Sequence, residues 1–236
     1  MIFSDSEEII MNNNSKHAIV LRAADAAVLA LMLGAAWGLC EAVLSGVVRS
    51  IAGELRAGVL TAIGMMIMGF GYGVARRPAI ALSAACVSAA TMLLAVPVLG
   101  CSFLCRANSM LAVTMNGVML TGCLCAFGNT RALSVTRLAA VASGAVLLST
   151  AVFYFGGMRL APCAYLLSFG GDWGLVRFLV REGAVGGALS AALLPSGAAA
   201  GAMASAAISK FAAERRVMAY GASAAWVAGC LMLIAL

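Results

Sequence analysis

The residue whose side chain is best suited to bind a ligand or a proton is Glu41, a carboxylate inside the apolar stretch GAAWGLCEAVLSG. Burying an ionised carboxylate in a membrane is costly unless the group is paired or protonated. Helical spacing places five residues of this stretch on one face, namely Gly34, Trp37, Gly38, Glu41 and Ser45. Because glycines four residues apart let two helices approach closely, the pattern predicts that this face points into a helix bundle.

A polar partner for Glu41 is indicated by the stretch CRANSMLAVTMNG, which begins at residue 105. Arg106 and Asn108 fall at the membrane edge that Glu41 approaches, and Asn116 falls a little deeper on an antiparallel helix. Polar groups that converge in an apolar pocket are typical of a small-molecule site. We therefore predict a substrate-binding site made of Glu41, Trp37, Asn116, Arg106 and Asn108. A hydrogen bond that only joins two helices explains Glu41 nearly as well.

Several kinds of catalytic and metal chemistry are disfavoured by what the sequence lacks. The one histidine, His17, precedes the first apolar span, which excludes bis-histidine haem ligation, a Ser–His dyad and a histidine-containing zinc site within the bundle. No Walker A sequence is present, so we expect no ATPase activity from this chain alone. The 14 methionines are typical packing residues of Ala- and Gly-rich helices rather than copper ligands. We predict no enzyme activity, no metal and no cofactor.

The eight cysteines divide by their position relative to the apolar spans. Five lie within spans and are expected to pack as small apolar side chains. Cys101, Cys105 and Cys163 fall in loops on the side opposite the N-terminus. A disulfide between Cys101 and Cys105, or between loops, is an option in an oxidising compartment, and the sequence leaves the disulfide state open.

The composition indicates an integral membrane protein. Of the 236 residues, 64% are hydrophobic and only 10% are charged, against about 25% charged in a typical soluble domain. The formal net charge of +6 comes from Lys and Arg scattered between apolar runs, where these side chains can meet lipid phosphates. No basic, aromatic-rich stretch predicts nucleic-acid binding.

The apolar stretches are long enough to cross a membrane as helices, because about 20 residues span the hydrocarbon core. The seven candidates are residues 26–48, 57–75, 79–99, 110–127, 138–157, 183–208 and 217–236. The sequence therefore predicts an all-α polytopic membrane bundle with six to seven transmembrane helices. A polar N-terminal tail, residues 1–25, precedes a single transmembrane domain, residues 26–236, and Met11 is an alternative start. Pro195 is expected to interrupt the sixth span.

The segment DWGLVRFLVREG, from Asp172 to Gly183, is too short to span a membrane and carries two arginines. Its first residue is a suitable N-cap, and its last is a suitable helix-ending glycine. Arg177 and Arg181 lie four residues apart on one face, from which long side chains can reach lipid headgroups. We predict a short interfacial helix near residues 173–182.

The distribution of positive charge predicts the orientation of the chain. With seven spans, loops on the N-terminal side carry more of the 15 Lys and Arg residues than loops on the other side. Cytoplasmic loops are enriched in these residues. We expect a multi-pass protein of the cell membrane, of the inner-membrane type, with a cytoplasmic N-terminus.

Three stretches resemble a loosely defined group of small bacterial integral membrane proteins. The first span carries a W-G-x-x-E pattern at Trp37, Gly38 and Glu41, and the second carries I-G-x-x-I-M at residues 63–68. The third stretch is RANSMLAVTMNGVML. In size and helix-only design the group is similar to the substrate-binding S components of energy-coupling-factor vitamin transporters. That similarity implies an outward-facing substrate pocket, with an ATPase and a transmembrane subunit as partners. A seventh span and the segment at 172–183 depart from the pattern.

These observations predict a membrane-embedded substrate-binding or transport subunit for an unidentified small molecule, without its own ATPase. The energy would come from an ATP-hydrolysing complex or, without a partner, from proton coupling through Glu41. The alternative is a non-catalytic structural or anchoring subunit of a larger membrane complex. The sequence does not identify the substrate.

Overall fold

The computed structural model describes residues 23–44, 55–94, 96, 103–127, 134–160, 162–214 and 216–235. All regular structure in these ranges is helical, so the all-α prediction is confirmed. Two elements, η1 and η3, are π-helical turns. The elements in chain order are α2 (Ala23–Leu39), η1 (Cys40–Leu44), α4 (Arg56–Ala75), α5 (Ala79–Leu94), α7 (Phe103–Phe127), α8 (Val135–Leu160), α9 (Ala164–Leu167), α10 (Gly174–Phe178), η3 (Leu179–Ala184), α11 (Val185–Glu214) and α12 (Arg216–Ala235).

Five helices in the described part of the chain are long and apolar enough to cross a membrane, which is consistent with a multi-pass membrane protein. They comprise α2 with most of η1, then α4, α7, α8 and the continuous run from α10 into α11. Helix α5 has 16 residues, which rise about 24 Å against a hydrocarbon core of about 30 Å. The apolar part of α12, Tyr220–Leu233, is also short. The count of six to seven spans therefore stays a prediction.

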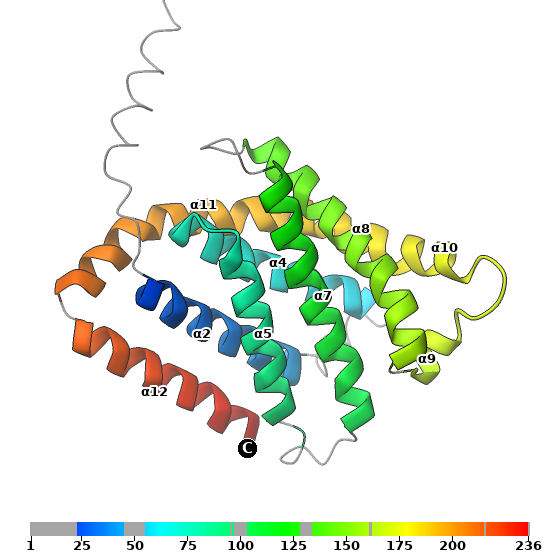
Figure 1. Cartoon of the computed structure of the whole chain (residues 1–236), viewed down its shortest axis with the longest axis horizontal. Coiled ribbons are helices and arrows are strands. Elements are labelled where there is room, and N and C mark those ends of the chain that lie inside the picture. The colour runs from blue at the N-terminus through cyan, green and yellow to red at the C-terminus, as the bar shows by residue number, and fades with distance from the viewer. Residues whose placement is uncertain are drawn as a thin grey trace, which may run out of the picture.

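Helix α4 occupies the centre of the bundle, where it contacts α2, α5, α7 and α11. Around it, α2 packs on α5, α5 on α7, α7 on α8, and α8 on α11. Figure 1 shows α11 running across the bundle, with α7 and α8 in front of it. The apolar window of α4 is 56% buried, the largest share among the five long helices, which fits its central place.

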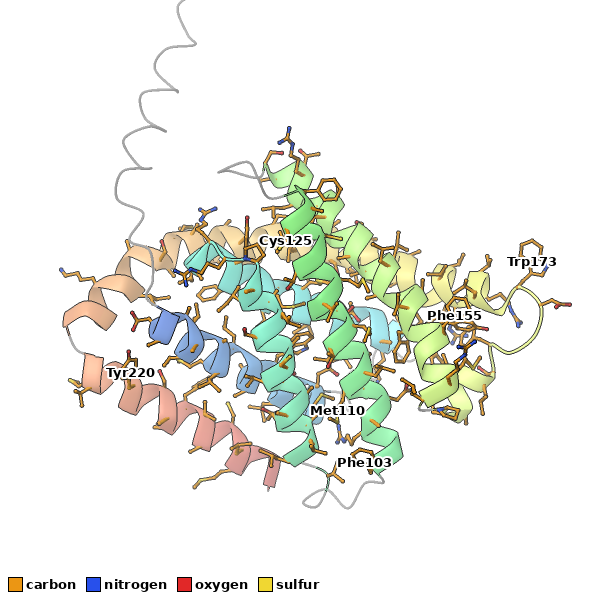
Figure 2. All side chains as sticks on the ribbon, viewed as in Figure 1. Phe103, Met110, Cys125, Phe155, Trp173 and Tyr220 are labelled. Atoms are coloured by element: carbon orange, nitrogen blue, oxygen red, sulfur yellow. The ribbon has the colours of Figure 1, made fainter. Side chains whose placement is uncertain are left out.

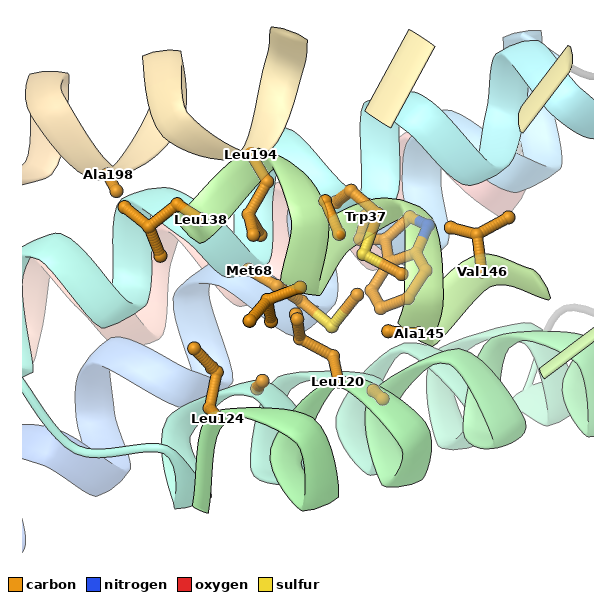
Figure 3. Packing of buried hydrophobic residues seen from close by; sticks show 14 of the residues in the cluster. Trp37, Met68, Leu120, Leu124, Leu138, Ala145, Val146, Leu194 and Ala198 are labelled. Carbon is orange, nitrogen blue, oxygen red and sulfur yellow. The ribbon is translucent and has the colours of Figure 1, made fainter. Parts of the chain in front are cut away.

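The buried core forms where the central helix meets its neighbours, and Trp37 lies within it. Figure 3 shows the indole in one cluster with Met68, Leu120 and Val146. Met65 and Met68 are fully buried in this cluster, as expected for methionines that fill space between small residues. The core therefore fixes the ring of Trp37, one helical turn before Glu41.

The glycines of α2 make the close helix contact that the sequence predicts. Gly34 packs against Val87 of α5, and Gly38 packs against Thr91 on the next turn of α5. A methyl group at Gly38 would lie 2.8 Å from Thr91 Cβ, which is closer than packed carbon atoms approach. The inward orientation is thus confirmed for both glycines, while Ser45 lies outside the described residues.

The pair formed by α4 and α11 approaches equally closely at the backbone. The two helices run parallel, because successive glycines of α4 meet successive turns of α11. Gly69 faces the carbonyl group of Leu194, Gly73 faces that of Ala198, and Gly201 faces that of Phe70. A side chain at any of these glycines would overlap the opposite backbone, so we expect the pair to move as one rigid unit.

The segment near residues 173–182 is helical, as predicted, but the prediction that it forms a short helix of its own is wrong. Residues from Gly174 onward form one helix that continues through the π-helical turn η3 into α11. Gly183 does not end a helix: it packs against Leu147 of α8, where a methyl group would lie 3.2 Å from that side chain. The residue that caps the helix is Trp173, with a left-handed φ of 63°, rather than Asp172. Trp173 projects from the loop and is 77% exposed (Figure 2).

The break predicted at Pro195 is also absent, since Pro195 lies inside the continuous helix α11. Ser196 donates a hydrogen bond from its hydroxyl to the carbonyl oxygen of Ala192 at 2.7 Å, within the same helix. Gly197 faces the carbonyl of Met66 on α4. The Pro–Ser–Gly sequence therefore packs closely against α4. This packing stabilises α11 across the proline.

Helix α12 lies along the outer side of α2 and runs parallel to it. The Tyr220 hydroxyl donates to Asp25 Oδ1 at 3.0 Å, near the start of both helices. Trp226 Nε1 donates to the carbonyl oxygen of Met32 at 3.4 Å, further along. The described part of the chain thus enters α2 and leaves α12 at opposite ends of the bundle.

Candidate functional site

Glu41 lies in the π-helical turn η1, which continues α2. The indole Nε1 of Trp37 donates a hydrogen bond to Glu41 Oε1 at 3.4 Å. Among the described residues, Trp37 is the donor to the Glu41 carboxylate, and it lies on the same helix. A π-helical turn contains one extra residue and is frequent at functional sites. The bond therefore orients the acid without joining α2 to another helix.

The position of Trp37 is set by α4. The side chain is 1% exposed, and its six-membered ring lies against Gly64. A methyl group at Gly64 would lie 2.9 Å from Trp37 Nε1 and still closer to the ring carbons. The glycine in the I-G-x-x-I-M pattern thus provides the space for the tryptophan in the W-G-x-x-E pattern, and the two patterns describe one contact.

Two arginines from other helices act on Glu41 electrostatically. Arg56 begins α4, Arg106 lies in the first turn of α7, and both contribute attractive charge at the carboxylate. Their helices also present the positive ends of their dipoles in the first turn. Sequence reasoning included Arg106 and missed Arg56, which stands at the edge of the second apolar span. The arrangement brings one negative and two positive groups from three helices to one end of the bundle.

Asn116 lies deeper than Glu41. Gly34 of α2 and Gly117 of α7 pack on the same turn of α5, so Asn116 is level with Gly34. The two helical turns between Gly34 and Glu41 rise about 10 Å. The described contacts therefore place Asn116 deeper than Glu41 by about two helical turns, further than the small difference that the sequence predicted.

Asn116 pairs instead with Ser149 of α8. The Ser149 hydroxyl contacts Asn116 Oδ1 at 2.5 Å and the carbonyl oxygen of Val146 at 3.0 Å. Asn116 is 5% exposed and Ser149 is 3% exposed. This pair joins α7 to α8 inside the bundle, which is a structural connection between two helices.

Asn108 reaches another part of the same end of the bundle. Its amide Nδ2 donates to Cys163 Sγ at 3.0 Å, and its Oδ1 is buried without a hydrogen-bond partner among the described residues. Cys163 is a free thiol. Of the other two cysteines predicted to lie in loops, Cys101 lies outside the described residues, and Cys105 lies in helix α7, with its side chain not described. The disulfide alternatives that involve these two cysteines stay open.

Sequence reasoning missed a second buried acid, Glu182, which is 6% exposed and lies in the π-helical turn η3. The Tyr165 hydroxyl donates a hydrogen bond to Glu182 Oε1. A signal was present in the sequence, because Glu182 follows the buried Gly174 and Phe178 at helical spacing. The arginines of this segment predicted contacts with headgroups, whereas Glu182 belongs to the buried face that carries Gly174 and Phe178.

The described residues contain no group of three or more His, Cys, Asp or Glu side chains placed to hold a metal ion. Comparisons with known protein families, curated proteins and solved structures find no match to this chain. The resemblance to small bacterial membrane proteins therefore stays a prediction.

Proposed function

We propose that the protein is a membrane-embedded substrate-binding or transport subunit for a small molecule. The binding site lies at the end of the bundle where α2 ends and where α4 and α7 begin. Glu41 provides the negative group, and Arg56 and Arg106 provide the positive ones. Trp37 orients the acid, and Asn108 adds a polar side chain to the same end. Asn116 supports the helices around the site rather than the ligand.

The observation that carries this proposal is the pairing of Glu41 within its own helix. An acid kept in a membrane span only to join helices is expected to bond across a helix interface. The hydrogen bond from Trp37 makes no such connection, while charges from α4 and α7 act on the same carboxylate. Intramembrane ionisable groups of this kind mark ligand or ion pathways.

The proposed transport also needs a source of energy. The chain carries no phosphate-binding loop, so active transport would need an ATP-hydrolysing complex with a transmembrane partner. Membrane lipid surrounds the exposed apolar side chains of the bundle. Proton coupling through Glu41 is the form of the proposal that needs no partner.

Ligand retention tests the proposal. The full chain, purified in mild detergent, is examined by native mass spectrometry for a bound small molecule. We expect the wild type to retain one, and Glu41→Gln and Glu41→Ala to lose it. Asp25→Asn is the matched control, because Asp25 lies on the same helix at the opposite end and bonds to Tyr220. Equal retention in all four proteins would remove Glu41 from the site.

A structural or anchoring subunit is the second candidate, and the Asn116–Ser149 pair favours it. That pair shows that polar groups inside this bundle do join helices. A wild-type protein that carries no ligand and purifies in fixed ratio with subunits lacking ATPase activity would support the anchoring function. The same experiment therefore separates the two candidates.

A further inference from the structure

A cation lies over two aromatic rings at the other π-helical turn. The guanidinium carbon of Arg181 is 5.9 Å from the centre of the Tyr165 ring and 5.7 Å from the centre of the Phe169 ring. The two ring centres are 5.3 Å apart, with an angle of 75° between the ring planes. The rings therefore form two walls of a corner, and a cation in front of both is attracted by both ring quadrupoles.

The corner is held in place by its surroundings. The Tyr154 hydroxyl donates to the carbonyl oxygen of Phe169 at 3.0 Å, and the Phe169 ring meets Phe178 edge to face at 5.2 Å. Gly174 lies so close to the Phe169 carbonyl that any side chain there would overlap it. Phe169 is 6% exposed, so its ring is fixed before any ligand arrives.

A buried carboxylate supplies negative charge beside the corner. Glu182 follows Arg181 directly in the π-helical turn, and its carboxylate accepts the hydrogen bond from the Tyr165 hydroxyl. That bond places the polar edge of the Tyr165 ring on the acid and leaves the ring face to the cation. Aromatic faces combined with a carboxylate are the groups that recognise organic cations.

The corner is open on one side. Tyr165 is 41% exposed, so its ring can be reached from outside the bundle. The Arg181 distances are close to the upper limit of about 6 Å at which a cation interacts with a ring. An arginine near a helix end can also turn towards lipid headgroups and leave the corner.

We propose that Tyr165, Phe169 and Glu182 form a binding site for a small organic cation of the guanidinium type, which Arg181 occupies in this structure. Arg181 acts as an intramolecular substitute for the ligand and must turn away before the ligand binds. The proposal stands apart from the site at Glu41, because it shares no residue with that site and makes no assumption about transport.

The test removes the internal cation and offers a free one. The full chain in phosphatidylcholine nanodiscs is titrated with methylguanidinium by calorimetry. We expect Arg181→Ala to bind it at least about tenfold more tightly than wild type, as the loss of a competing cation–ring contact implies. Methylurea, which has the same shape without the charge, should not bind. Arg181→Ala combined with Glu182→Gln should lose the gain.

The matched control is Arg177→Ala, one helical turn earlier, whose guanidinium bonds to the carbonyl of Gly170 instead of a ring face. It should bind methylguanidinium no better than wild type. Equal affinity in the two alanine variants, equal binding of methylurea, or no binding to Arg181→Ala would each overturn the proposal. If Arg181→Ala does not fold, Arg181→Met keeps the apolar stem for the same titration. Failure of both to fold with methylguanidinium present also overturns it.

Discussion

Glu41 and Glu182 occupy the same local setting at two places in the bundle. Each lies in a π-helical turn of a membrane-length helix, and each accepts a hydrogen bond from an aromatic side chain. Each also has arginine near it, either on neighbouring helices or at the adjacent residue. An extra residue in a helical turn rotates the following side chains by about 100°, so each turn redirects its acid.

The two acids differ in where the aromatic donor comes from. Trp37 is four residues from Glu41 on the same helix, whereas Tyr165 is 17 residues from Glu182 in the separate segment α9. The first bond is local and does not join α2 to a neighbouring helix. The second connects α9 to the long helix that begins at Gly174. A glutamate in a π-helical turn is thus oriented by its own helix at position 41, whereas at position 182 it joins two separate elements.

The largest expected effect comes from disturbing the local pair without changing either member. Gly64→Ala places a methyl group against the Trp37 ring, inside a packed core. Overpacking of this kind costs about 1–3 kcal/mol, and displacing the ring moves the donor away from Glu41. We expect the free energy of unfolding to fall by that amount in a denaturant titration in detergent, together with a change in tryptophan emission.

Gly122→Ala is the control for that substitution. No atom lies within 4 Å of the position that its methyl group would take. Alanine is more stable than glycine inside a helix by about 0.5–1 kcal/mol, so this variant should be unchanged or more stable. Opposite signs for the two glycines are the expected result. A loss of similar size at both would show that the ring contact at Gly64 does not set the effect, because alanine by itself favours the helix.

A smaller effect is expected for the interior pair of Asn116 and Ser149, which is an interhelical bond without an acid. Single alanine variants and the double variant form a cycle that isolates the bond from other losses. Such bonds in membrane bundles contribute about 0.6 kcal/mol on average, with a maximum near 1.7. The burial of both side chains places the expected coupling in the upper half of that range. No measurable coupling would mean that the pair does not join α7 to α8 energetically.

The sequence was sufficient for features that depend on residues close together in the chain. Apolar length and composition predicted the helices, and the spacing of Gly34 and Gly38 predicted a close contact with a neighbouring helix. The Trp37–Glu41 bond follows from the same helical spacing, since residues four apart share a face. These relations need no knowledge of which helices are neighbours.

The missed features depend on how helices are placed in space. The depth of Asn116 relative to Glu41 is set by contacts of both helices with α5, which no local pattern records. The continuation of the helix through Gly183 depends on α8, against which that glycine packs. Glycine and proline have two uses, to end helices and to let helices approach, and only the neighbouring backbone decides between them. Glu182 was missed because its segment was separated from the span to which it belongs.

The smallest expected effect tests the contrast between the two acids directly. Tyr165→Phe removes the hydroxyl that ties α9 to Glu182 and keeps the ring, so the loss is confined to one hydrogen bond. Amide hydrogen exchange should become faster in α9 and in the loop that follows it. Glu41→Gln should leave exchange in α9 and in the loop that follows it unchanged, because the hydrogen bond of Glu41 lies within α2 and η1. Tyr220→Phe is the matched control, since its hydroxyl joins α12 to α2 and its loss should leave exchange in α9 unchanged. Faster exchange in α9 after Glu41→Gln would mean that the local acid also connects distant elements, and the distinction between the two acids would no longer hold.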